Sequence, residues 1–261
     1  MRLDVRTLLA AVPLLALGCG AGLAPSDPRA SGSGTGAAMA PVDPAAGEEA
    51  GHHRSWFFIV PRPVPIDGRT TLGWIPQFWR YLYSVPASQN PELNPSADCG
   101  VGQAGPVFFI PGEQNDVYTR ACTIPAHEPV FFSIWSAFND YPCPDPTFQP
   151  APGQSLVDFL AQGAQAFDDA VSNLAATIDG TSIDVSRYRY TTGLVSFTGD
   201  PSLTATFDGC VTGTRQVGVA DGWFVLLLLS PGDHTLVVTA TSPGGHATSQ
   251  TFVLHVLGDD D

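Results

Sequence analysis

The pattern of apolar and polar positions divides the chain into a tether and a folded body. Residues 20–54 consist mainly of Ala, Gly, Ser and Pro, with almost no side chain large enough to bury, so we expect a disordered tether there. From Ser55 onward, apolar runs of strand length alternate with turn residues. This alternation predicts one folded body over 55–258, followed by an acidic tail at 259–261.

Most apolar runs in the body have the length and the turn boundaries of β-strands. Runs of this kind occupy residues 56–60, 106–110, 117–124, 129–135, 176–184 with an Asp-Gly turn, 187–198, and 234–256 with a Gly-Gly turn. Because strand-like runs make up most of the body, the sequence predicts a mainly β fold.

Two segments have the spacing of an amphipathic helix instead, with apolar side chains three and four residues apart. In residues 75–86 these side chains lie near one face, and Pro76 is tolerated in the first turn. In residues 155–174 the spacing is clearer, and Ser155 and Asp158 form an N-terminal capping pair. We therefore expect two helices laid on the strands.

The last two strands define a core face and a solvent face. If Gly245 is the centre of their turn, Leu236 lies on one face with Leu254, and polar residues share the other face with His255. A slip of one residue would set His234 opposite His255, as in a metal site, but would mix apolar and polar side chains on both faces. We therefore reject this histidine pair as a site.

Seven apolar residues in a row, at 223–229, are too many for a strand with one wet face and too few to span a bilayer. One face can fill a core, and the other needs a second cover. Candidate covers are the helix around Phe159–Val171 and the aromatic helix around Trp79. If neither packs there, the open face is the best candidate for a partner-binding surface. Residues 230–233 are expected to cross to the facing sheet.

The N-terminus resembles a bacterial lipoprotein signal. Two Arg precede an apolar stretch that is too short for a membrane span. Residues Ala16–Cys19 resemble a lipobox, although Leu is more usual than Ala at the first of these positions. We predict a signal peptide over 1–18 and a lipidated Cys19, which anchors the 19–54 segment to an outer membrane or cell surface. A plain cleaved signal is the alternative.

Five cysteines leave four in the body once Cys19 is assigned to the lipid. Four cysteines in an exported chain suggest two disulfides, for which three pairings are open. We expect Cys99 with Cys122, because these two flank one apparent hairpin, and Cys143 with Cys210. Free buried thiols are the alternative. A zinc site is disfavoured because no CxxC or HxxxH spacing occurs.

The charge balance is strongly acidic, with 25 acidic against 11 basic residues and a net charge of -14. Such a surface repels phosphate backbones, so we expect no nucleic-acid partner. No metal or cofactor site is predicted. Calcium is kept as an alternative for two acidic loops, Asn139–Pro146 and Ser230–Asp233, which lack EF-hand spacing.

Known catalytic motifs are incomplete in this chain. Residues 100–105 match GxGxxG, but no strand precedes them and no helix follows, as a phosphate loop requires. His127 and Glu128 begin HExxH, but Phe131 stands where the second His belongs. No GxSxG elbow occurs. Whether the protein is an enzyme therefore stays open, with a non-catalytic protein favoured.

Five residues are candidates for binding a ligand. Tryptophan rings stack on sugars where they face outward, and Trp79, Trp135 and Trp223 are candidates for such contacts. Asp221 lies at the start of the long apolar run, and His234 lies at the corner that follows it. The competing roles are core packing for the tryptophans and a backbone hydrogen bond for His234.

Four segments resemble blocks of a family of uncharacterised secreted bacterial proteins, which carry GQxGPVxFLxG, RxCxVPAGxxxFFP and DGxWxxLxxLxPGxHT. The segments are GQAGPVFFIPG at 102–112, TRACTIPAHEPVFF at 119–132, ATIDG at 176–180 and DGWFVLLLLSPGDHTL at 221–236. The chain departs from the family at His127, where Gly is usual, and at Ser133, where Pro is usual. The resemblance covers most of the body and implies an extracytoplasmic β-rich protein, without a known activity.

The segment SPGDHTLVVTAT, at 230–241, is similar to the end of many bacterial immunoglobulin-like domains, with His234 in place of a corner Tyr. This resemblance implies an immunoglobulin-like β-sandwich, with one or two helices covering one sheet. The favoured function is a non-catalytic cell-envelope lipoprotein that binds a surface glycan or a protein partner. The alternatives are an extracytoplasmic hydrolase of polysaccharides or esters, and a purely structural envelope module.

Overall fold

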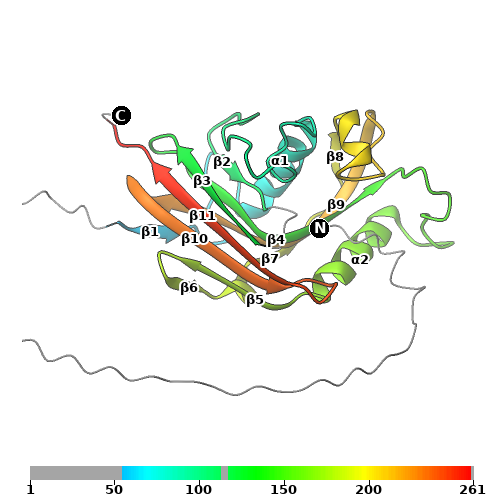
Figure 1. Ribbon diagram of the computed structural model, residues 1–261. Helices are drawn as coiled ribbons and strands as arrows, with labels where there is room; N and C mark the ends of the chain where they lie inside the picture. Colours follow the sequence, from blue (N-terminus) through cyan, green and yellow to red (C-terminus); the bar gives the residue numbers. More distant parts are fainter. Residues whose placement is uncertain (1–54, 113–116, 260–261) are drawn as a thin grey trace, which may run out of the picture.

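The computed structural model describes residues 55–112 and 117–259, which form two β-sheets and two helices (Figure 1). Two apolar cores divide these elements into layers, one core on each face of the first sheet. The predicted signal peptide, the lipidated Cys19 and the tether lie outside the described residues. The fold is β-rich, in agreement with the strand pattern of the sequence.

The first sheet is built around one long central strand. Its strands are β1 (Phe57–Ile59), β2 (Phe108–Ile110), β4 (Val130–Tyr141), β7 (Arg189–Thr191), β8 (Val195–Thr198) and β9 (Arg215–Leu229). The central strand β9 pairs antiparallel with β4 on one side, and with β8, β7 and β1 in turn along the other side. β2 is parallel to β4 at the edge.

The second sheet faces the first and ends in the C-terminal hairpin. Its order is β3 (Val117–Ile124), β11 (Ala247–Val256), β10 (Gly232–Thr241), β5 (Ser172–Ile178) and β6 (Thr181–Ile183). Leu236 pairs with Phe252, so the hairpin differs by two residues from one centred on Gly245. Because a shift of two preserves the faces, the predicted core face is correct, and His234 and His255 lie on opposite sides.

The long apolar run of β9 fills two cores at once. Phe224 and Leu226 point to the layer formed by α1 (Thr71–Ser84), whereas Val225 and Leu227 point to the second sheet. The aromatic helix is therefore the second cover that the run requires. The turn after β9 crosses to the second sheet, as predicted, and the result is a helix layer on a two-sheet sandwich.

Helix α1 begins four residues before the predicted start. The hydroxyl of Thr70 caps it by accepting the N–H of Gly73 at 3.4 Å, and Pro76 lies inside the helix rather than in its first turn. Gly73 and Pro76 concealed this start in the sequence, because both residues are unfavourable in a helix interior. The packing of the apolar face on the first sheet outweighs that local cost.

Helix α2 (Leu156–Asp169) covers the ends of β4 and β9 on the same side as the second sheet. The side chain of Ser155 caps it by accepting the N–H of Asp158 at 3.2 Å, as predicted. The helix ends five residues before the predicted end, because the chain then enters β5. Gly163 permits a close approach to β4, since a Cβ there would lie 2.0 Å from Nδ2 of Asn139.

Strand β4 continues six residues beyond Trp135, where the predicted strand ends, and it contains a bulge. The pairing with β9 skips Ile134. Because of this extra residue, Phe131 and Phe138 both face α1 although their positions in the strand differ by an odd number. The bulge thus lets both halves of β4 contribute to the helix layer.

Both predicted disulfides are present, between Cys99 and Cys122 and between Cys143 and Cys210. Two disulfides indicate an extracytoplasmic protein. Among the described residues, no helix has the length and hydrophobicity needed to cross a membrane. The immunoglobulin-like topology is not shown by this strand order, in which β2–β4 and β3–β11 are parallel pairs.

Candidate functional site

The five candidate binding residues do not share one exposed surface. Trp79 and His234 are 3% and 1% exposed, and Asp221 is fully buried. Trp135 and Trp223 are half-buried, opposite each other on β4 and β9. Trp79 packs in the helix layer, where its ring stacks on Phe138. We therefore do not place the binding surface on these residues.

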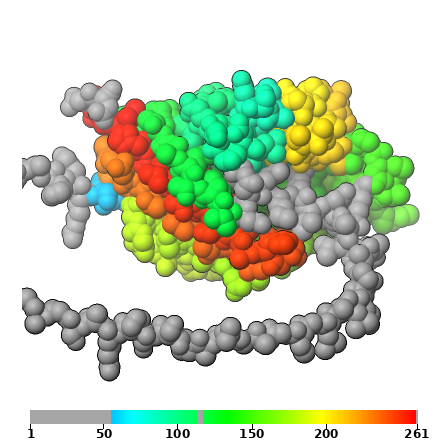
Figure 2. Space-filling model, viewed as in Figure 1, coloured from blue at the N-terminus to red at the C-terminus, as the bar shows by residue number. Residues whose placement is uncertain are grey.

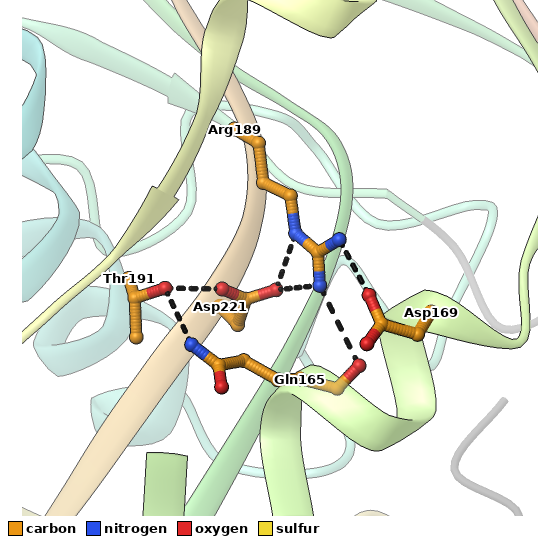
Figure 3. A network of polar contacts seen from close by, with 5 residues as sticks. All are labelled: Gln165, Asp169, Arg189, Thr191 and Asp221. Atoms are coloured by element: carbon orange, nitrogen blue, oxygen red, sulfur yellow. Dashed lines mark hydrogen bonds and ion pairs between the residues drawn. The ribbon is translucent and has the colours of Figure 1, made fainter. Parts of the chain in front are cut away.

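Asp221 is the centre of a polar network that joins β9, β7 and α2 (Figure 3). Nε and an amino group of Arg189 lie 2.8 and 2.7 Å from Oδ2 of Asp221, and the hydroxyl of Thr191 donates to Oδ1 at 2.5 Å. The other amino group of Arg189 lies 2.6 Å from Asp169. The Gln165 amide donates to Thr191 at 3.1 Å. The network attaches the C-terminal half of α2 to the first sheet.

Asp168 of α2 lies beside this network and was not singled out by the sequence. The residue is 1% exposed, and neither carboxyl oxygen has a hydrogen-bond partner among the described residues. Burial raises the pKa of Asp168 well above its ordinary value, and the neighbouring carboxyl group of Asp221 raises it further. The charge of Arg189 and the nearby backbone of Ala137 oppose this shift. Asp168 and Asp221 thus form a buried acid pair.

The corner around His234 has the residue types of a serine-hydrolase triad, but its contacts are structural. Nδ1 of His234 lies 2.7 Å from Asp179, and Nε2 lies 2.9 Å from the carbonyl oxygen of Ser230 but 3.4 Å from its hydroxyl. The Ser230 hydroxyl accepts the N–H of Trp56 at 3.0 Å and is buried. The His234 ring therefore connects the side chain of Asp179 to the backbone carbonyl of Ser230. The contact with the backbone is the competing role that the sequence suggested for His234.

A second group of acidic residues lies near the end of β4. Oxygens of Asp140 and Asp208 and the sulfur of Cys210 lie within 4.8 Å of one another. That sulfur is part of a disulfide and is not a thiolate ligand. The Tyr83 hydroxyl donates to Asp208 at 2.6 Å, and the Gln216 amide to Asp140 at 3.3 Å. Asp140 belongs to the first of the two loops in which calcium was the alternative, and its contacts here are internal hydrogen bonds.

Two large exposed aromatic side chains lie at β1, Phe58 within the strand and Trp56 one residue before it, in a segment that the sequence did not single out as a site. Trp56 and Phe58 are 55% and 50% exposed, whereas Phe57 and Ile59 turn towards the core between the sheets. β1 is an edge strand of the first sheet, and it lies at the left of Figures 1 and 2. The continuous apolar run in the sequence showed a strand, but not which of its faces would stay open.

No protein-family model matches the chain, and no curated protein matches it. Among solved structures, the solution structure of amebosin is similar with a TM-score of 0.19 and 11% sequence identity, over 59% of this chain and 100% of that chain. A TM-score this low carries no structural or functional argument. The resemblance to uncharacterised secreted bacterial proteins therefore stays a prediction.

Proposed function

We propose that this protein is a non-catalytic module of the bacterial cell envelope, held to a membrane by a lipid on Cys19, that binds a surface glycan through β1. The observation that carries the proposal is the exposure of Phe58 on the edge strand β1 and of Trp56 one residue before it, where the backbone still bonds to Ser230 after β9. Large aromatic side chains are normally buried in a soluble domain, so an open pair requires an explanation.

The geometry of β1 favours a glycan over a protein partner. Side chains two residues apart on a strand project on the same face, about 6 to 7 Å from each other. Two aromatic rings at this spacing form a small platform on which sugar rings can stack. A stable protein interface needs about 800 Å² from each partner, which is more than two side chains offer.

The buried acid pairs argue for a binding role and not for the hydrolase alternative. A glycosidase needs two carboxyl groups that reach its substrate. Asp168 and Asp221 are 1% and 0% exposed, and Asp140 and Asp208 are 2% and 8% exposed. The immunoglobulin-like origin of the C-terminal half is kept as part of the proposal, on the strength of the corner segment alone.

A glycan array tests the proposal with the chain from Gly20 onward, its disulfides formed. We expect binding to at least one envelope polysaccharide. Trp56→Ala/Phe58→Ala should lose about tenfold or more in affinity, by comparison with the stacking of a base on an aromatic ring, which is worth about 1–3 kcal/mol. The matched control is Val117→Ala, which removes a side chain that is 73% exposed on the second sheet. Its affinity should equal that of the unaltered protein.

Two results would count against the glycan assignment. A flat array for the unaltered protein removes it, and capture of an envelope protein that depends on Trp56 and Phe58 moves the same surface to a protein partner. Equal losses in the β1 variant and in Val117→Ala would show a general effect on the fold rather than a binding surface. Urea unfolding of each variant separates that case, because exposed truncations change stability by less than about 0.5 kcal/mol.

A further inference from the structure

Asp168 occupies a position on α2 that would ordinarily be apolar. The buried residues of this helix are Leu160, Ala164 and Asp168, which are spaced by four and form one stripe. Leu160 and Ala164 pack against the first sheet in the usual way. The stripe ends with a carboxyl group, which faces the completely buried Asp221 of β9.

The carboxyl groups of Asp221 and Asp168 differ in their hydrogen-bond partners. Asp221 accepts two contacts from Arg189 and one from Thr191, so both of its oxygens are occupied by donors. The carboxyl oxygens of Asp168 have no hydrogen-bond partner among the described residues. An ionised Asp168 would therefore be a second buried negative charge beside Asp221, opposed only by the backbone of Ala137 and the charge of Arg189, which is costly. A protonated Asp168 can donate its O–H to Asp221.

The ionised groups around the pair would carry an excess of negative charge. The charged groups that face Asp168 are Asp221 from β9 and Arg189 from β7, and Arg189 is shared with Asp169 of α2 itself. β4 contributes the backbone of Ala137. One guanidinium thus serves three carboxyl groups, two of which are buried. A proton between the buried two reduces this excess of negative charge.

We propose that a proton shared by Asp168 and Asp221 holds the C-terminal half of α2 on the first sheet, and that α2 is released as the pH rises. The C-terminal half of the helix is suited to release because its remaining polar attachments, through Gln165 and Asp169, lie at the partly exposed Arg189. The N-terminal half keeps a separate attachment, in which the Asn139 amide of β4 donates to the carbonyl oxygen of Leu160 at 3.2 Å. Release exposes Asp168 to water, where it ionises. One proton therefore leaves the protein with each opening of α2.

The direction of the pH effect follows from the raised pKa of Asp168. The docked helix favours the protonated acid, so the stabilisation is complete below the ordinary pKa of an aspartate, about 3.9. It decreases as the pH rises above that value, until the pH passes the raised pKa of the docked state. α2 is accordingly expected to be held more firmly in acid than at neutral pH.

Hydrogen exchange measured with the chain from Gly20 onward tests the proposal. Between the two pKa values, the protection of the α2 amides relative to those of β10 and β11 should fall about tenfold for each unit of pH, after correction for the intrinsic rate. Asp168→Asn keeps the shape and an N–H donor towards Asp221 but cannot ionise, so its protection ratio should not change with pH. The matched control is Asp169→Asn, an adjacent and exposed residue, which should retain the slope.

The proposal is overturned if the protection ratio of the unaltered protein does not depend on pH, or if the slope persists in Asp168→Asn. Should that variant fail to fold, a carbon-13 titration of the aspartate side chains in the unaltered protein replaces it. A carboxyl carbon assigned to Asp168 that titrates well above pH 4 supports the shared proton. Titration at the ordinary value of an aspartate rejects it.

Discussion

His234 and His255 look alike in the sequence, since each lies in a C-terminal strand of alternating pattern. Each also contacts an aspartate at a similar distance, 2.7 Å from Asp179 for His234 and 2.8 Å from Asp233 for His255. The two pairs differ in burial, because the His234 side chain is 0% exposed and that of His255 is 55% exposed. Burial decides what each pair contributes, since water screens the exposed one.

We therefore predict a large difference between two matched substitutions. His234→Phe should lower the free energy of unfolding by about 3 kcal/mol, because Asp179 and the Ser230 carbonyl lose their buried partner. His255→Phe should change it by less than about 0.5 kcal/mol. Urea unfolding at pH 6 measures both. Equal losses would show that the buried corner has no special role in stability.

At the scale of the element, α1 covers the face of the first sheet that points away from the second sheet. Phe78 makes ring contacts with Phe109, Phe131 and Phe224, from three different strands. Leu72, on the same helix, is 44% exposed and outside the aromatic cluster. The helix is thus attached by one fully buried side, and its stability depends on that side rather than on helix propensity.

Truncation of a side chain on the buried side of α1 should therefore cost much more stability than truncation on its exposed side. Phe78→Ala should cost about 3–5 kcal/mol, because it leaves a cavity among the rings of the first sheet. Leu72→Ala should cost less than about 0.5 kcal/mol. Thermal unfolding followed by near-ultraviolet circular dichroism reports both the loss and the change in aromatic packing. A small effect of Phe78→Ala would contradict the assignment of α1 as the second cover of β9.

At the scale of the whole molecule, the two disulfides connect segments that are distant in sequence. Cys143, after β4, is bonded to Cys210 in the loop before β9, across a separation of 67 residues. Cys99 is bonded to Cys122 on the edge strand β3, across 23 residues. The longer link closes around α2, β5 to β8 and the loops between them, so it restricts more of the unfolded chain.

Removal of the disulfide that closes the longer loop should cause the larger loss of stability. Cys143→Ser/Cys210→Ser is expected to cost about 4 kcal/mol and Cys99→Ser/Cys122→Ser about 3 kcal/mol, from the entropy of loop closure in the unfolded state. Each double variant leaves the other disulfide intact and acts as its control. Urea midpoints under non-reducing conditions compare the two. A clearly larger loss for the shorter loop would reject the entropic account for this protein.

Features that depend on neighbours along the chain were predicted from the sequence. The strand at 117–124, the cap of α2 by Ser155 and the core face of the last hairpin are correct, because alternation and capping are local rules. The start of α1 was missed because the local rules disfavour Gly73 and Pro76 inside a helix, whereas the packing of α1 on the first sheet keeps both residues helical. The extension of β4 was missed because its bulge exists only through pairing with β9.

The sequence by itself determined that the body is β-rich with two helices, and it predicted two disulfides among the four cysteines of the body, which the structure confirms. Only the tertiary structure decided that Trp79 is buried while Trp56 and Phe58 are open, and that Asp168 meets Asp221. The physical reason is the same in each case. Alternation shows that a strand has two faces. Which elements pack on each face depends on segments that lie tens of residues away in the sequence. That packing decides which side chains are exposed and whether a buried carboxyl group can be charged.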